Sequence, residues 1–226
     1  MDRRALLFGA AGVGAAALGG AALLRPAPQS GPLLPFGVAN AQTSDEAETD
    51  FEVLEMVLGD PESPVELIEY SSFTCPHCRN LHANLLPQVM ADYVEPGRIR
   101  YVYREVYFDR FGLWAGMVAR CGGPERYFGI VDLIYQQQPE WTQGSPADIA
   151  ESLRRIGRTA GLTNDELDAC MSSQPMAEAL IAAYEAHTEE HDISGTPTLV
   201  INDVMHGNMS YEDLSALLDE ALAEAQ

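Results

Sequence analysis

The sequence contains no lysine. All 13 of its basic residues are arginines, and it has 34 aspartates and glutamates, so the 226-residue chain carries a formal net charge of −21. Nucleic-acid binding needs a basic surface that displaces counterions, and docking on an anionic membrane needs clustered basic residues. The charge balance therefore argues against both kinds of partner and predicts a well-solvated acidic surface.

Long apolar stretches are scarce, and the exception lies at the N-terminus. Arg3 and Arg4 precede Ala5–Leu24, which carries no charge and consists mainly of alanine, glycine and leucine. Ala39-Asn40-Ala41 then supplies an A-x-A cleavage site. We therefore expect residues 1–41 to be an export signal of the Sec or twin-arginine type.

The same apolar run is long enough to span a bilayer as an uncleaved N-terminal anchor. Glycine and alanine insert poorly, which favours cleavage. Residues 42–50 are polar and acidic and are interpreted as a linker. With either fate of the N-terminus, we expect residues 51–226 to lie in the periplasm, where disulfides persist.

Cysteine is also scarce, with only Cys75, Cys78, Cys121 and Cys170. Cys75 and Cys78 form a C-x-x-C pair, which serves either redox chemistry or half of a zinc site. A zinc site would need two more ligands, and Cys121 and Cys170 stand far apart in the sequence. A carrier that holds copper or zinc through its thiolates is an alternative to a redox enzyme.

The C-x-x-C pair lies between a predicted strand and a predicted helix. Val65–Tyr70 and Arg98–Val106 have the composition of strands, and Phe51–Leu58 is a candidate edge strand. Between the first two strands, apolar residues recur at four-residue steps, as in a helix: Leu81, Leu85, Val89 and Tyr93. Pro87 should kink this helix, because it lacks an N–H group.

This strand–helix–strand order places Cys75 at the N-terminus of the helix. Unpaired backbone N–H groups and the helix dipole favour a thiolate there. A stabilised thiolate stabilises the reduced form and makes the disulfide more oxidising. His77 adds to this effect if it is protonated or donates a hydrogen bond.

The segment 111–192 has helical patterns only. Five helices are expected there: Phe111–Gly122, one from Pro124, one from Ser145-Pro146, a short one capped by Thr163 and Glu166, and one from about Met176 to Asp192. Gly195–Ile201 then predicts a turn and a strand, and Asn202-Asp203 a hairpin turn into Val204–His206. Ser210 is expected to cap a last amphipathic helix.

Three features together resemble the DsbA family of exported disulfide oxidoreductases. They are Phe73-Thr74-Cys75-Pro76-His77-Cys78, the helical segment, and Gly195-Thr196-Pro197-Thr198. The resemblance implies an α/β, thioredoxin-like fold over residues 51–226, with an inserted helical domain at about 111–192. It also implies that Cys75 is the exposed nucleophile and that Cys78 is the buried partner that resolves the mixed disulfide. Pro76 and His77 would be the dipeptide that tunes the redox pair.

The resemblance assigns three further residues to the site. Pro197 matches the family's cis-proline, and Thr196 before it would bind the substrate backbone. Glu69 matches a buried acidic residue beneath the active site. From the strand pattern alone, Glu69 would instead lie on a solvated face.

The resemblance further implies clients that are unfolded or reduced exported proteins, a membrane partner that re-oxidises the enzyme through quinone, and no cofactor beyond the redox-active disulfide. The expected activity is oxidation of client dithiols. A reductase or isomerase of the same fold is the alternative.

The remaining candidates carry less specific patterns. Cys121 and Cys170 are either a structural disulfide or two buried thiols, and the exported context favours the disulfide. His187 to His191 fits H-x-x-E-H, but a packed helix face accounts for it and no third ligand follows, so we expect no metal. His82 and His206 belong to no motif.

Overall fold

The structure is a computed structural model that describes residues 51–225. The predicted export signal and the linker both lie outside these described residues. Within residues 51–225, no helix is both long enough and apolar enough to cross a membrane.

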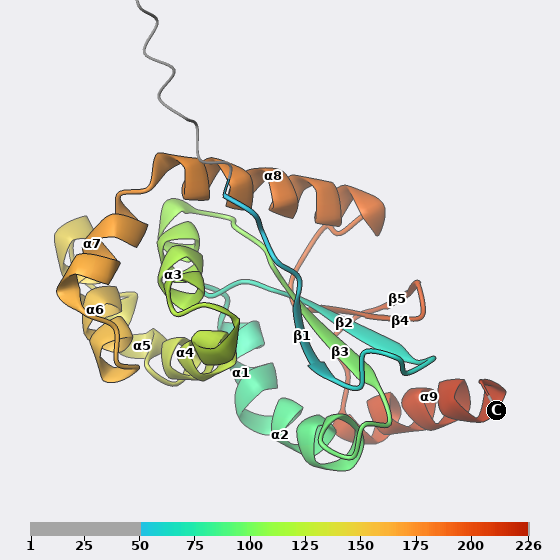
Figure 1. Cartoon of the computed structure of the whole chain (residues 1–226). Helices are drawn as coiled ribbons and strands as arrows, with labels where there is room; N and C mark the ends of the chain where they lie inside the picture. The colour runs from blue at the N-terminus through green and yellow to red at the C-terminus, as the bar shows by residue number, and fades with distance from the viewer. Residues whose placement is uncertain (1–50, 226) are drawn as a thin grey trace, which may run out of the picture. The chain divides into compact units, whose positions relative to one another are not determined.

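A five-stranded mixed sheet lies at the centre of the described part (Figure 1). Its strands are β1 (Met56–Gly59), β2 (Glu66–Ser71), β3 (Arg100–Glu105), β4 (Thr198–Ile201) and β5 (Val204–His206). Their order across the sheet is β1-β3-β2-β4-β5. Strands β2 and β3 are parallel, and the other neighbouring pairs are antiparallel. The predicted edge strand and the hairpin after β4 are both confirmed, although β1 is shorter than expected.

The connection from β2 to β3 forms the predicted βαβ unit. Its helices are α1 (Pro76–Asn84), α2 (Leu86–Val89) and the π-helix η1 (Met90–Val94). The expected interruption at Pro87 is confirmed, because α1 and α2 are separated at Leu85. The four apolar residues at four-residue steps are all buried.

Six helices connect β3 to β4. They are α3 (Arg110–Cys121), α4 (Pro124–Gln136), α5 (Gln138–Trp141), α6 (Pro146–Thr159), α7 (Asn164–Met171) and α8 (Gln174–Glu190). The sequence pattern predicts five of them and misses α5, a single turn too short to show a helical period. Thr163 and Glu166 form the predicted capping box of α7, and Ser145 caps α6.

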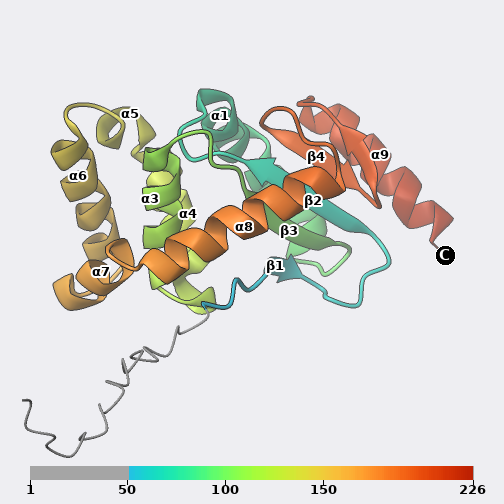
Figure 2. The same cartoon turned by 90° about the horizontal axis from the view of Figure 1, so that it is seen from above.

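Both faces of the sheet are covered. Helix α8 crosses one face over β2 and β3, where Ile68 and Tyr70 pack beneath it (Figure 2). Leu67 and Tyr101 point to the other face, into the main core that also contains residues of α1, α4 and α9 (Tyr211–Glu224). A central strand with both faces covered buries every side chain it carries, polar ones included.

Glu69 is a polar side chain that is buried in this way. It lies in β2 with an exposed fraction of 0%. The solvated position that the strand pattern alone suggests is therefore wrong, because helices cover both sides of the strand. A buried carboxylate needs hydrogen-bond partners, and the partners of Glu69 lie at the candidate active site.

Candidate active site

Cys75 and Cys78 lie where the chain leaves β2 and enters α1. Cys75 is the N-cap of α1, with extended backbone angles of φ −82° and ψ 121°, and Pro76 occupies the first helical position. Cys75 is partly exposed, whereas Cys78 is fully buried one turn later, and the two thiols are free. Pro76 and His77 between them are exposed. The arrangement presents one sulfur to a partner and holds the second behind it.

The Cys78 side chain is buried away from solvent. Burial raises the pKa of its thiol to about 12, and the hydrogen bond from the Ser72 backbone only partly opposes this effect. The backbone N–H of Ser72 donates to the sulfur at 3.4 Å. Cys78 therefore holds its proton at neutral pH while it is a free thiol.

Thr196 and Pro197 lie directly against the pair. The peptide bond between them is cis, and the Thr196 carbonyl oxygen accepts a hydrogen bond from Cys75 Sγ at 3.5 Å. The pairing of β4 with β2, in which Thr198 lies opposite Tyr70, brings this segment to the active-site loop. Residues about 120 positions apart in the chain thus form one site.

Glu69 lies on the α1 side of β2 and has three hydrogen-bond partners. It accepts hydrogen bonds from Ser71 Oγ and from the Tyr101 hydroxyl, the latter at 2.6 Å, and it lies 2.9 Å from His82 Nε2. Burial alone would raise the pKa of Glu69, but the charge and hydrogen bond of His82, with the two hydroxyls, bring it below its ordinary value. Glu69 is therefore held as a buried carboxylate.

His82 also belongs to the site, although no motif in the sequence predicts it. Its side chain is 5% exposed, stacks on the Tyr135 ring at a centroid distance of 4.0 Å, and meets Tyr103 edge-on. The spacing of His82 from Cys78 in the sequence could have indicated that it lies near the pair. His82 follows Cys78 by four residues, so the two side chains lie on the same face of α1.

Two other side chains that no sequence motif predicts, those of Gln138 and Asp109, hold the active-site loop. Gln138 Nε2, from α5, donates to the carbonyl oxygens of Phe73 at 2.7 Å and Cys75 at 3.0 Å. Thr74 Oγ1 donates to Asp109 Oδ2 at 2.8 Å. Asp109 in turn caps α3. The helices between β3 and β4 therefore fix the backbone around the nucleophile.

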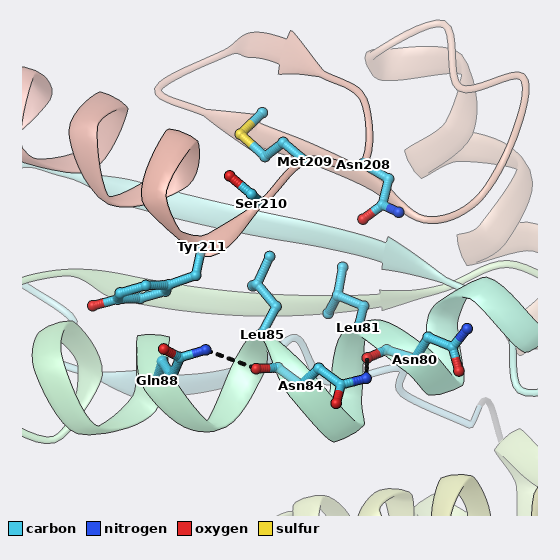
Figure 3. A pocket seen from close by; sticks show the side chains of 9 residues that line it. All are labelled: Asn80, Leu81, Asn84, Leu85, Gln88, Asn208, Met209, Ser210 and Tyr211. Carbon is cyan, nitrogen blue, oxygen red and sulfur yellow. Dashed lines mark hydrogen bonds between the residues drawn. The ribbon is translucent and has the colours of Figure 1, made fainter.

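A groove runs beside α1, between that helix and the chain entering α9 (Figure 3). Its volume is about 320 Å³, and Leu81, Leu85 and Met209 give it an apolar floor. Asn80 and Asn208 add amide groups at its rim. The lining contains no charged side chain, although the chain as a whole is strongly acidic.

The other two cysteines are distant from this site. Cys121 and Cys170 form a disulfide with a Cα–Cα distance of 5.8 Å, which joins the end of α3 to α7. Among the described residues, no group of three or more histidine, cysteine or acidic side chains is placed to hold a metal ion.

The histidines of the H-x-x-E-H pattern serve the packing of α8. Tyr70 donates from its hydroxyl to the His187 carbonyl oxygen at 2.9 Å, and the same hydroxyl lies 2.7 Å from His191 Nδ1. Arg104 on β3 also contacts this hydroxyl and pairs with Glu55 and Glu190 rather than with Glu69.

Comparison with known proteins decides the family. The family model described as "Thioredoxin" matches residues 52–220, which is most of the chain. The chain belongs to the thioredoxin family. This thioredoxin-family protein is 34% identical over 173 residues to a "Putative protein-disulfide oxidoreductase" of Rickettsia bellii, a match that covers 76% of this chain and 66% of the relative.

Two further comparisons show similarity in sequence to one named protein and in fold to one solved structure. "Disulfide bond formation protein D" of Bacillus subtilis is 22% identical over 176 residues, covering 74% of this chain and 76% of the relative. The crystal structure of Wolbachia pipientis alpha-DsbA1 matches with a TM-score of 0.70 and 24% identity, over 79% of this chain and 96% of that chain. The predicted thioredoxin-like fold with inserted helices is confirmed. The chain spans 61–66% of the length of the five Rickettsia relatives.

Proposed function

We propose that this protein is a thiol:disulfide oxidoreductase that oxidises client dithiols through a disulfide between Cys75 and Cys78. One observation carries the proposal: a partly exposed cysteine at a helix N-terminus, with a buried cysteine one turn behind it and the Thr196 carbonyl against its sulfur. The names of the relatives from Rickettsia and Bacillus support the same chemistry.

The proposed reaction has two exchange steps. A client thiolate attacks Cys75 Sγ of the oxidised protein, the bond to Cys78 breaks, and Cys78 leaves with the electron pair and gains a proton. The second client thiol, after losing its proton, attacks the client sulfur of the mixed disulfide and releases Cys75. The client loses two electrons, and the protein gains them as a dithiol.

The oxidising direction is supported by the place of Cys75. The N-cap lies at the positive end of the α1 dipole, which favours an anionic sulfur on the nucleophile and hence the reduced form. An exchange protein with a stabilised reduced form acts as an oxidant. A reductase or isomerase of the same fold is the second candidate, and a measured potential near about −270 mV, the value of thioredoxin, would favour it.

The same proposal assigns roles to the surrounding residues. Pro76 and His77 tune the pair, Glu69 provides a buried carboxylate beside it, and Thr196 with Pro197 receives the client backbone. The uncharged groove along α1 adds amide and apolar contacts for an extended client segment (Figure 3). Such a lining suits unfolded polypeptides of varied sequence.

We also propose that the protein works outside the cytoplasm, in the periplasm, after export by the N-terminal signal. The disulfide between Cys121 and Cys170 supports this location, because such bonds persist in oxidising compartments. Its clients would be reduced exported proteins, and a membrane protein linked to quinone would re-oxidise it.

The test uses the oxidised protein and a peptide with two thiols, with disulfide formation followed by mass spectrometry. We expect Cys75→Ser and Cys78→Ser each to abolish oxidation, because neither variant can form the disulfide that the client thiolate attacks. The double variant Cys121→Ser/Cys170→Ser is the matched control and should retain oxidation. Oxidation that survives in Cys75→Ser, or stoichiometric copper or zinc in protein purified under reducing conditions, would contradict the proposal.

A further inference from the structure

Gln138 reaches from the inserted helices to the backbone of the active-site loop. Its Nε2 atom donates to two carbonyl oxygens, that of Phe73 at 2.7 Å and that of Cys75 at 3.0 Å. A side-chain amide has two N–H donors, so both are used here. Gln138 is only 4% exposed, and the two hydrogen bonds are therefore largely shielded from solvent. One side chain thus ties α5 to the residue that carries the nucleophilic sulfur.

Fixed contacts hold Gln138 in this position. Trp141, at the other end of α5, is fully buried, and its Nε1 donates to the Ile134 carbonyl oxygen of α4 at 2.8 Å. Thr142 follows as the C-cap of α5, and its Oγ1 donates to the carbonyl oxygen of Gln138 itself at 2.7 Å. The single turn of α5 is therefore anchored on α4, and its first side chain is presented to the active-site loop in a defined place.

The Cys75 carbonyl is close to the Cys75 sulfur in the covalent structure, since both groups belong to one residue. This carbonyl is also the first acceptor of α1, because it accepts a hydrogen bond from the Arg79 N–H at 3.2 Å. The oxygen is the negative end of the carbonyl dipole, and a negative dipole end beside the sulfur disfavours a thiolate. A second N–H donor on the same oxygen offsets that dipole. The Phe73 carbonyl receives the same compensation from Gln138.

We propose that Gln138 is a positioning residue that makes the Cys75/Cys78 pair more oxidising, because it holds the Phe73 and Cys75 carbonyls and offsets their dipoles. This inference rests on the proposed redox function and deepens it. The N-terminus of α1 favours the Cys75 thiolate, and Gln138 adds to this effect from a separate element of the fold. A more stable thiolate stabilises the reduced form, and the disulfide becomes a stronger oxidant. The inserted helices thus take part in setting the redox potential.

A purely mechanical role for Gln138 makes a different prediction. In that case Gln138 only stiffens the loop, and any other tie on the loop should affect the redox pair in the same way. The chain contains such a tie, since Thr74 Oγ1 donates to Asp109 Oδ2 at 2.8 Å and touches neither carbonyl. Thr74→Val removes this hydrogen bond with little change in the shape of the side chain. It therefore separates the two roles.

Two variants of Gln138 test the role of its donors. Gln138→Met has a side chain of similar length without an N–H group. Gln138→Glu keeps the shape of the amide but brings carboxylate oxygens toward the two carbonyls, so it should act in the same direction and more strongly. Gln136→Met changes an exposed glutamine of α4 in the same way and is the matched control.

The experiment brings each protein to equilibrium with mixtures of reduced and oxidised glutathione, and stops samples with acid. Peptide mass spectrometry then gives the fraction that carries the disulfide between Cys75 and Cys78. In Gln138→Met we expect the equilibrium constant for forming this disulfide to rise about tenfold, which lowers the potential by about 30 mV. Gln138→Glu should raise it further, Thr74→Val should change it much less, and Gln136→Met should match the wild type.

A second measurement separates this effect from a general loss of stability. Urea denaturation is carried out on the reduced and the oxidised form of each protein, with the disulfide between Cys121 and Cys170 intact in both. Gln138→Met should lose more stability in the reduced form than in the oxidised form, because only the reduced form carries the thiolate that Gln138 favours. A purely mechanical role would destabilise both forms equally and leave the glutathione equilibrium unchanged.

The proposal is overturned by a wild-type equilibrium constant in both Gln138 variants, by a shift in the opposite direction, or by an equal shift in Thr74→Val. Failure of the proposed function looks different. The wild type itself would then form no disulfide between Cys75 and Cys78 at any glutathione ratio. A wild-type potential near that of thioredoxin would favour the reductase, and the difference between the wild type and Gln138→Met would still test the role of Gln138.

Discussion

Arg120 of α3 and Glu105 of β3 form a buried, two-pronged ion pair. Arg120 Nε and Nη2 each donate to a different carboxylate oxygen at 2.7 Å, and the two residues are only 8% and 6% exposed. Tyr127 of α4 donates to the same carboxylate at 2.7 Å, and Arg120 also donates to the Leu54 carbonyl oxygen at 2.9 Å. The pair thus ties the sheet to the first inserted helices and to the chain that enters β1.

Removing one partner of this pair should destabilise the fold strongly. Glu105→Gln leaves the Arg120 charge buried without its counterion, and we expect a loss of about 3–5 kcal/mol in the free energy of unfolding. Arg120→Met should cost a similar amount, and the double variant less than the sum of the two. Urea denaturation measures all three. Arg154→Met, which removes an exposed ion pair with Asp168, is the control and should cost no more than about 1 kcal/mol.

The sequence predicts well the features that depend on residues close together in the chain. The Cys75 and Cys78 spacing, the Thr163 capping box and the interruption at Pro87 each involve neighbours in the chain, and local physics determines them. The same holds for the hairpin turn at Asn202, where the positive φ of 44° suits an asparagine.

The features that local patterns alone do not reveal depend on contacts between distant elements. Glu69 is buried because helices cover both faces of β2, and nothing near it in the sequence reveals that cover. His82 becomes part of the site only because α1 packs against Glu69 and Tyr135. Gln138 holds the active-site loop from α5, a turn too short to have a hydrophobic period. Local patterns thus predicted the nucleophile but not the groups that surround it.

The two active-site thiols should differ sharply in reactivity. With a pKa of about 12, on the order of one Cys78 in 10⁴ is a thiolate at about pH 8, and the sulfur is also buried. Iodoacetamide should therefore label Cys75 of the folded, reduced protein and leave Cys78 unlabelled, as peptide mass spectrometry would show. Unfolding in guanidinium is the control and should expose Cys78. Equal labelling of both thiols in the folded protein would contradict the assignment of Cys78 as the buried partner.

The disulfide between Cys121 and Cys170 should contribute stability without taking part in the exchange. The two cysteines are 49 residues apart, so the bond removes considerable freedom from the unfolded chain. We expect Cys121→Ser/Cys170→Ser to lower the free energy of unfolding by about 2–4 kcal/mol. Urea denaturation of both proteins with Cys75 and Cys78 in the same redox state measures the difference. An unchanged midpoint and slope would show that the bond does not stabilise the fold.

The buried carboxylate of Glu69 should make stability depend on acid pH. Its pKa is lowered from 4.5, because the effects of His82, Ser71 and Tyr101 outweigh that of burial. The unfolded chain therefore binds a proton more readily than the folded protein does. The stabilisation from Glu69 is fully present above about pH 4.5 and is lost as the pH falls through the folded-state pKa.

Glu69→Gln removes this contribution, since an amide does not titrate. We expect the free energy of unfolding of the wild type to fall more steeply than that of Glu69→Gln between about pH 6 and about pH 3. Urea denaturation at a series of pH values gives both slopes. Glu185→Gln, which removes an exposed carboxylate of α8, controls for the change in net charge and should follow the wild type. Parallel slopes for wild type and Glu69→Gln would mean that the folded protein does not hold Glu69 as a carboxylate.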